Sequence, residues 1–279
     1  MKGDAKLTMK ATNELVLKKV FEHAAAVDEY CAQHNCTRIM TGLFGSQNYG
    51  LDTPASDVDT KSIIVPDLHD WLWSTEGYCN HVLTMPDGSH AEMKPVVGMF
   101  KQFVKGNINF LEILYTPYID IAPGWEWVYE ALTSAADNIT RHNMYQQSRV
   151  WLGYINQMMK RTFNPSEQLG YRVELGYNPK ALMNALRLKQ TFIRYFEFQR
   201  PFDESIDLSE LRHELLNVKQ GFCSKEYAQT LIDDMELWCI KADKYIKQHY
   251  EDKEVFNADW YLRMLAVEIF KGEDRIVCG

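Results

Sequence analysis

Two aspartates one residue apart, Asp57 and Asp59, lie just ahead of an apolar run in the sequence SDVDTKSIIVP. If both belong to a strand, their side chains share a face and their Cα atoms are about 6.5 to 7 Å apart. Two ionised carboxylates on one face repel each other unless a cation lies between them. Mg²⁺ suits such a pair, because it is commonly held by one or two carboxylates together with substrate phosphates. The pair therefore predicts a divalent-cation site; the alternative is that Asp57 is a turn residue and Asp59 is only solvated.

A Gly-Ser pair precedes the aspartates in the stretch LFGSQNYGLD. Glycine allows close approach of a ligand to the backbone, and exposed N–H groups with a serine hydroxyl can hold phosphate oxygens. Gly45 and Ser46 alone would indicate an ordinary turn. Beside Asp57 and Asp59 they predict a nucleotide site that joins a phosphate-binding turn to a metal clamp. Lys61 follows on the same strand face, where it would contact a phosphate or the aspartates, or form a simple ion pair.

The elements that must position these residues mix strands and helices up to about residue 124. Helical spacing of apolar residues predicts a helix over 12–34, and short apolar runs predict strands over 37–44 and 57–66. The stretch NHVLTMPDGSHAEMKPV contains a Pro-Asp-Gly-Ser turn and predicts a β-hairpin. Short helices are expected on either side of Gly106.

Beyond residue 124 the pattern is helical throughout. Helices are predicted over roughly 126–134, 140–162, 179–199, 207–219, 224–250 and 256–271. Strands mixed with helices, followed by helices alone, predict an α+β fold in two domains, residues 1–124 and residues 125–279.

The composition limits the classes of function. A chain of 279 residues with 46% apolar content can bury a large core, and its net charge of −8 disfavours a long nucleic-acid track. The six cysteines form no CxxC pair, which is typical of reduced thiols in a cytoplasmic protein. No apolar run of about 18 residues occurs, so no membrane association is expected. We expect a cytoplasmic location.

Three blocks in order, GSQNYG…SDVD, FVKGNINFLEILYTP and YNPKALMNALRL, give the chain a family resemblance. They resemble the DNA polymerase beta superfamily of nucleotidyltransferases, and are most similar to a group of predicted bacterial and phage members. The resemblance covers about residues 40–190. It implies a small mixed-sheet catalytic domain followed by an all-helical domain that closes the nucleotide cleft. It also implies two-metal chemistry, with Mg²⁺ or Mn²⁺ as cofactor and a nucleoside triphosphate (NTP) as substrate.

The resemblance also implies roles for particular residues. Asp57 and Asp59 would hold the metal ions, and a third carboxylate is expected on a neighbouring strand. Glu92 fits that place, although many members of the superfamily have Asp there; a solvent-facing hairpin Glu is the alternative.

A second set of residues follows one face of a predicted helix. Lys180, Asn184 and Arg187 are spaced i, i+4 and i+7. The resemblance implies that this face contacts the triphosphate, whereas a solvated face is the ordinary meaning of such spacing.

The predicted function is transfer of a nucleoside monophosphate from an NTP to an acceptor hydroxyl, with release of pyrophosphate. The acceptor would be an RNA or DNA 3′ end, a protein side chain or a small molecule, and a short RNA end needs few basic contacts. A modest basic wall for such an end could be made by Arg161, Arg172, Lys180, Arg187, Lys189 and Arg194. The alternatives are an inactive nucleotide-binding or antitoxin-like interaction module, and a phosphohydrolase, for which no histidine–aspartate metal cluster is recognisable.

Overall fold

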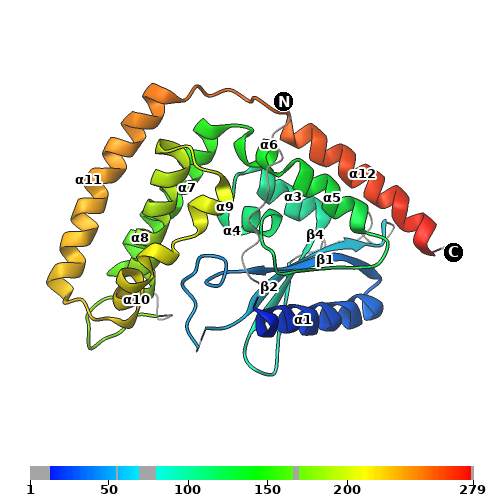
Figure 1. Cartoon of the computed structure of the whole chain (residues 1–279), viewed down its shortest axis with the longest axis horizontal. Helices are drawn as coiled ribbons and strands as arrows, with labels where there is room; N and C mark the ends of the chain where they lie inside the picture. Colours follow the sequence, from blue (N-terminus) through cyan, green and yellow to red (C-terminus); the bar gives the residue numbers. More distant parts are fainter. Residues whose placement is uncertain (1–12, 55, 69–79, 166–169, 278–279) are drawn as a thin grey trace.

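The computed structural model of the chain describes residues 13–54, 56–68, 80–165 and 170–277. A mixed β-sheet packs among many helices, and helices alone follow its last strand (Figure 1). The predicted combination of a mixed sheet with a helical second half is confirmed. No helix in the described ranges is long and apolar enough to cross a membrane.

The sheet has five strands in the order β3-β4-β2-β1-β5. They are β1 (Cys36–Phe44), β2 (Asp59–Pro66), β3 (His81–Thr84), β4 (His90–Pro95) and β5 (Ile119–Ile121). β2 and β4 run parallel and the other neighbours run antiparallel. The central strand β2 is buried from its second residue to its last, as expected for a strand that is covered on both faces.

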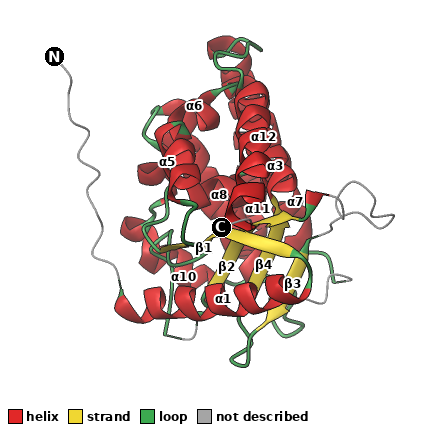
Figure 2. Ribbon diagram, turned by 90° about the vertical axis from the view of Figure 1, so that its right-hand side faces the viewer, coloured by secondary structure: helices red, strands yellow, loops and turns green. Residues whose placement is uncertain are grey.

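Helix α1 (Glu14–Gln33) covers one face of the sheet, and α3 (Val96–Val104) lies on the other (Figure 2). Asn13 caps α1 by accepting a hydrogen bond from the Leu15 amide; Thr12, at the predicted start, lies outside the described residues. Side-chain alternation divides β2 between the two faces, because Ile64 packs in the cluster beneath α1 and Ile63 packs in the main cluster on the opposite face.

The remaining helices surround the face opposite α1. They are α4 (Ile108–Leu111), the 3₁₀ helix η1 (Glu112–Leu114), α5 (Glu126–Ser134), α6 (Ala136–Arg141), α7 (Met144–Thr162), α8 (Pro179–Phe192) with its π-helical continuation η2 (Ile193–Glu197), α9 (Phe202–Ile206), the 3₁₀ helix η3 (Ser209–Leu211), α10 (Arg212–Gln220), α11 (Lys225–His249) and α12 (Ala258–Val277). The helix predicted over 140–162 is divided between α6 and α7, and the one predicted over 207–219 begins later, as α10. The other predicted helices are confirmed within a few residues at their ends, except that α12 continues past the predicted end at residue 271 to Val277.

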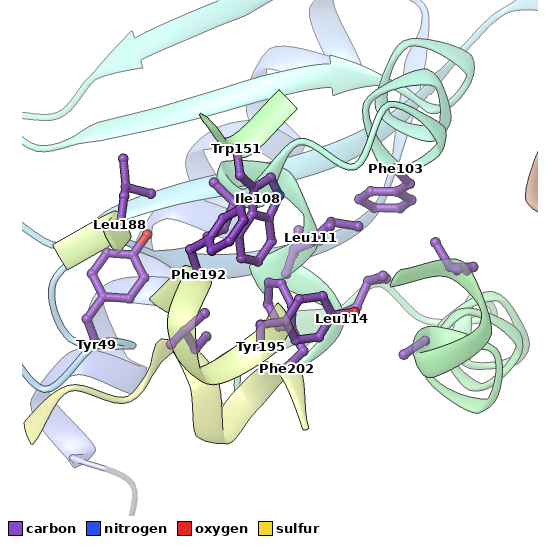
Figure 3. Packing of buried hydrophobic residues seen from close by; sticks show 14 of the residues in the cluster. Tyr49, Phe103, Ile108, Leu111, Leu114, Trp151, Leu188, Phe192, Tyr195 and Phe202 are labelled. Atoms are coloured by element: carbon purple, nitrogen blue, oxygen red, sulfur yellow. The ribbon is translucent and has the colours of Figure 1, made fainter. Parts of the chain in front are cut away.

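The main hydrophobic cluster draws residues from both sides of residue 124 (Figure 3). Trp151 of α7 stacks on Tyr195 at a centroid distance of 5.3 Å, and the same cluster contains Phe103 of α3 and Tyr49 from the loop after β1. Helix α12 also returns to pack against α3. The sheet and the helices thus share one core, and the division into two domains stays a prediction.

A buried histidine links α1 to the sheet. His23 is fully buried, with Nδ1 2.9 Å from the Thr60 hydroxyl and Nε2 3.0 Å from the Ser89 hydroxyl. Burial lowers the pKa of His23 below 6.5, although the nearby Asp87 acts in the opposite direction. Burial therefore favours the neutral imidazole.

We expect acidification to destabilise the fold through His23. The unfolded chain binds a proton at this side chain near pH 6.5 and the folded chain does so only at lower pH, so stability is lost as the pH falls through this window. Each proton that the unfolded chain binds in excess of the folded chain lowers the free energy of unfolding by about 1.36 kcal/mol for every pH unit of acidification. Urea unfolding at about pH 7.5 and about pH 5.5 measures the decrease in the free energy of unfolding between the two pH values. This decrease should be smaller in His23→Gln than in the wild type. The exposed-site control His249→Gln should keep the full loss, and equal losses in all three proteins would contradict the assignment.

Candidate functional site

A cavity of about 580 Å³ lies between the sheet face opposite α1 and helices α7, α8 and α10. Every residue that the sequence predicts to contact metal or nucleotide lines it: Gly45, Ser46, Asp57, Asp59, Lys61, Glu92, Lys180, Asn184 and Arg187. These residues come from three separate stretches of the chain, and the fold gathers them around one space.

The sheet side of the cavity carries three carboxylates, which we call the carboxylate wall: Asp57, Asp59 and Glu92. Asp59 is the first residue of β2, and its Oδ1 accepts a hydrogen bond from the His90 amide at 2.9 Å. Asp57 lies before β2, so the prediction that both aspartates belong to one strand is wrong. The Asp57 carbonyl instead accepts a hydrogen bond from Gln47 Nε2 at 3.0 Å, which holds this segment against the preceding turn.

Glu92 lies on β4 directly beside Lys61 of β2 in the parallel register. Lys61 Nζ is 2.8 Å from Glu92 Oε2, and the Lys61 side chain is only 4% exposed. The sequence left open whether Lys61 contacts a phosphate or the aspartates, or forms a simple ion pair. The structure shows an ion pair, and its partner is Glu92. Glu92 is on the strand next to the aspartates, as the resemblance implies, and its side chain already has a cation partner.

The turn after β1 begins at Gly45, whose φ of +105° is a conformation that favours glycine. The Ser46 carbonyl accepts hydrogen bonds from the amides of Tyr49 at 3.2 Å and Leu51 at 2.9 Å. The Gly45 amide donates to Glu112 Oε2 at 3.1 Å. We expected the N–H groups around Gly45 to bind a phosphate, but this one already binds the Glu112 carboxylate.

Glu112 is a site-supporting residue that the sequence reasoning missed. Its carboxylate is fully buried and accepts from three donors of the turn: the Gly45 amide, Asn48 Nδ2 at 3.1 Å and the Tyr49 hydroxyl at 2.9 Å. Burial raises the pKa of Glu112, and the three donors oppose this rise because they favour the ionised form. The sequence signal for Glu112 was that it is a lone acidic residue inside the apolar stretch NFLEILY. Such a residue is expected to be buried, and a buried carboxylate needs hydrogen-bond donors from neighbouring segments.

The helical side of the cavity carries three cations, which we call the cationic wall: Lys180 and Arg187 of α8 and Lys219 of α10. Arg187 is 4% exposed, and its guanidinium carbon is 4.0 Å from the centroid of the Tyr49 ring. Its Nε and Nη1 have no hydrogen-bond partner among the described residues. A buried guanidinium with free donors beside a cavity is suited to an anion.

Lys219 was also missed by the sequence reasoning. Burial lowers the pKa of its ammonium, and the nearby Lys180 lowers it further while Asp57 acts in the opposite direction. Lys219 therefore lies within electrostatic reach of both walls. Sequence spacing could not indicate this position, because α10 reaches the cavity only through the tertiary fold.

Residues before and within α10 form hydrogen bonds to the turn after β1 and so hold this turn against the helices. The Leu208 amide donates to the Tyr49 carbonyl at 2.9 Å. Arg212 donates to the Gly50 carbonyl at 2.6 Å and also to the Asp52 carbonyl. The turn that carries Gly45 and the helix that carries Lys219 are therefore held together directly.

The basic wall predicted for a short RNA end does not form as a set of six. Arg172 pairs with Glu174 at 2.7 Å and donates to the Gln220 carbonyl at 2.8 Å. Arg194 is buried and pairs with Glu210. Internal acceptors thus neutralise these two residues, and only Lys180 and Arg187 of the six line the cavity.

The donor atoms of the carboxylate wall suit a hard divalent cation. Asp57 and Asp59 offer carboxylate oxygens, the ligands that Mg²⁺ prefers, and substrate phosphates commonly complete such a shell. Over the described parts of the chain, no three His, Cys, Asp or Glu side chains converge as ligands of one metal ion.

No family model matches the chain, and no curated protein matches it either.

Proposed function

We propose that the chain is a metal-dependent nucleotidyltransferase, which transfers a nucleoside monophosphate from an NTP to an acceptor hydroxyl and releases pyrophosphate. One observation carries the proposal: the carboxylate wall and the cationic wall face one cavity of about 580 Å³. A divalent cation bound to an NTP presents both complementary charges, the metal ion toward carboxylates and the phosphates toward cations.

The phosphates would bind to the cationic wall. Arg187 has the free donors and the burial that a phosphate contact requires, and a guanidinium matches phosphate oxygens in a bidentate arrangement. Lys180 and Lys219 would add charge on the same side. Leu51 and Met183 supply apolar lining, which suits the nucleoside part of the substrate.

Asp57 and Asp59 would hold the divalent cation. When bound, such an ion would polarise the triphosphate and stabilise the charge that develops on the leaving pyrophosphate. The acceptor oxygen forms a bond to the α-phosphorus, the α–β phosphoanhydride bond breaks, and pyrophosphate leaves with that electron pair. The hydroxyl proton passes to solvent or to a carboxylate of the wall. The task of the cationic wall is to orient the phosphates for this in-line displacement.

The activity is tested with each of the four NTPs, labelled at the α-phosphate, and Mg²⁺ or Mn²⁺. The acceptors offered are short RNA ends, the chain itself with other proteins, and small hydroxylated molecules. Pyrophosphate release with label on an acceptor supports the proposal. Binding of NTP with no transfer to any acceptor would favour the inactive binding module, and release of unattached labelled nucleoside monophosphate would favour a phosphohydrolase.

Removal of the Arg187 charge should weaken NTP binding without unfolding the chain. A hydrogen bond to a charged phosphate contributes about 1.5 to 3 kcal/mol, so Arg187→Met should lower the affinity for a magnesium complex of a nonhydrolysable NTP analogue by about tenfold or more. Stability should change little, because the variant also removes two buried donors, Nε and Nη1, that have no hydrogen-bond partner among the described residues. Calorimetry measures the affinity and urea unfolding the stability. Arg172→Met, outside the cavity, is the matched control, and equal affinities of the two variants would remove Arg187 from the phosphate site.

A further inference from the structure

Lys61 and Glu92, which both line the cavity, form a cation–carboxylate pair. The two residues are direct neighbours in the parallel β2–β4 register, and Nζ lies 2.8 Å from Oε2. The Lys61 side chain is 4% exposed and that of Glu92 is 21% exposed. Both line the cavity beside Asp59.

The Lys61 ammonium is also held by two aromatic rings. Its Nζ is 3.2 Å from the centroid of Phe44, at the end of β1, and 4.8 Å from that of Phe110 in α4. Cation–π attraction strengthens where water is excluded, as it is around this side chain. The ammonium is therefore enclosed by β1, β4 and α4 and is fixed against Glu92.

A second lysine lies near the same carboxylate. Lys94, two residues along β4, is buried, and the charge of Glu92 acts to raise its pKa while burial lowers it overall. Two ammonium groups, those of Lys61 and Lys94, therefore lie within electrostatic reach of Glu92. A divalent cation at Glu92 would have to approach these ammonium groups and displace one of them.

We propose that the Lys61 ammonium is the permanent cation partner of Glu92, so that the site takes a single divalent ion, on Asp57 and Asp59 with the nucleotide. The inference rests on the proposed function and gives Glu92 a different role from the one that the family resemblance implies. Lys61 supplies beside Glu92 the positive charge that a second metal ion would supply.

The number of bound ions tests this without any measurement of turnover. Mn²⁺ is titrated, with detection by electron paramagnetic resonance, in the presence of a saturating nonhydrolysable NTP analogue. The wild type should bind one Mn²⁺ per chain. Lys61→Met, which is similar in length and uncharged, should bind two because Glu92 becomes available, and Lys61→Arg should bind one. Two ions in the wild type, or one ion in a folded Lys61→Met, would overturn the inference.

A second variant keeps the test decisive if Lys61→Met does not fold. Lys61→Met combined with Glu92→Gln, which removes both charges of the pair, should still bind one Mn²⁺, with affinity within about threefold, because a carboxylate and the ammonium that neutralises it together add little attraction for the ion. Loss of the ion, or a fall in affinity of about tenfold or more, would make Glu92 a metal ligand and overturn the inference. Absence of Mn²⁺ and nucleotide binding in the wild type would be a different result, because it would overturn the proposed function itself.

Discussion

Asp59→Asn should abolish metal-dependent NTP turnover while leaving the chain folded. The asparagine keeps an oxygen that can accept the His90 amide hydrogen bond, so the β2–β4 contact survives. It removes the negative charge that attracts a divalent cation into the cavity. We expect a fall in kcat/KM of at least about a hundredfold, equivalent to about 2.7 kcal/mol of transition-state stabilisation. Pyrophosphate release measures the rate, and urea unfolding checks the fold.

Asp57→Asn should behave in the same way, because Asp57 lines the same cavity. Asp233→Asn is the matched control: this residue lies on α11, where it accepts a hydrogen bond from Gln229, and it should keep the wild-type rate. If either cavity variant retains more than about a tenth of the wild-type rate, a loss of under roughly 1.4 kcal/mol, the aspartates do not hold a catalytic metal.

Much of the fold was predictable because its signals are local. The strand over 37–44 and the hairpin with its Pro-Asp-Gly-Ser turn are both present, since alternation and turn residues act over a few positions. The start of the strand predicted over 57–66 was wrong by two residues. Asp57 precedes the β1–β2 ladder, which ends at the Phe44–Asp59 pair, and a contact with Gln47 replaces strand pairing there.

The helical half shows where local pattern stops being informative. The segment predicted as one helix over 140–162 is interrupted between α6 and α7, where Asn143 takes an extended conformation and caps α7 by accepting from the Gln146 amide. The short α9 was not predicted; it follows Pro201 and buries Phe202 against Trp151 and Tyr195. Tertiary packing, rather than periodicity, decides such short elements.

The candidate site was predictable to the extent that its residues are close in sequence or share a face. Asp59 and Lys61 follow from strand alternation, and Lys180 and Arg187 follow from helical spacing. Lys219 could not be found in this way, because it reaches the cavity from α10 only once the helices pack. The Lys61–Glu92 pairing depends on the parallel β2–β4 register, which no single stretch of sequence specifies.

Glu112 connects the core to the turn after β1 and, through Tyr49, to the cationic wall. It holds the Gly45 amide at the entry to the turn and the Tyr49 hydroxyl within it. Burial raises the pKa of Tyr49 well above its ordinary value, which keeps that hydroxyl protonated as a donor. The Tyr49 ring in turn supports the guanidinium of Arg187. A change at Glu112 should therefore affect stability and nucleotide affinity together, although Glu112 itself does not line the cavity.

Glu112→Leu, which keeps similar bulk but no acceptor, should destabilise the chain by about 3 kcal/mol. It leaves the donors of Gly45, Asn48 and Tyr49 without their acceptor, and an unsatisfied buried donor costs about 1 to 3 kcal/mol, less where water can reach it. Glu112→Gln is the matched control. Its carbonyl oxygen can accept from two of the donors, and its NH₂ can donate to the Tyr49 hydroxyl, which then acts as the acceptor. We expect Glu112→Gln to lose about 1 kcal/mol or less, as measured by urea unfolding.

The same two variants separate a positioning role from a purely structural one. Under conditions where both are folded, the affinity for the magnesium complex of a nonhydrolysable NTP analogue should fall markedly in Glu112→Leu and remain near wild type in Glu112→Gln. The reason is that the relaxed turn no longer fixes Tyr49 beneath Arg187, so the cationic wall loses its preorganised phosphate contact. A destabilised but folded Glu112→Leu with wild-type affinity would show that Glu112 only supports the core. A loss of affinity in Glu112→Gln equal to that in Glu112→Leu would mean that the negative charge of Glu112, rather than its hydrogen bonds to the turn, governs nucleotide binding.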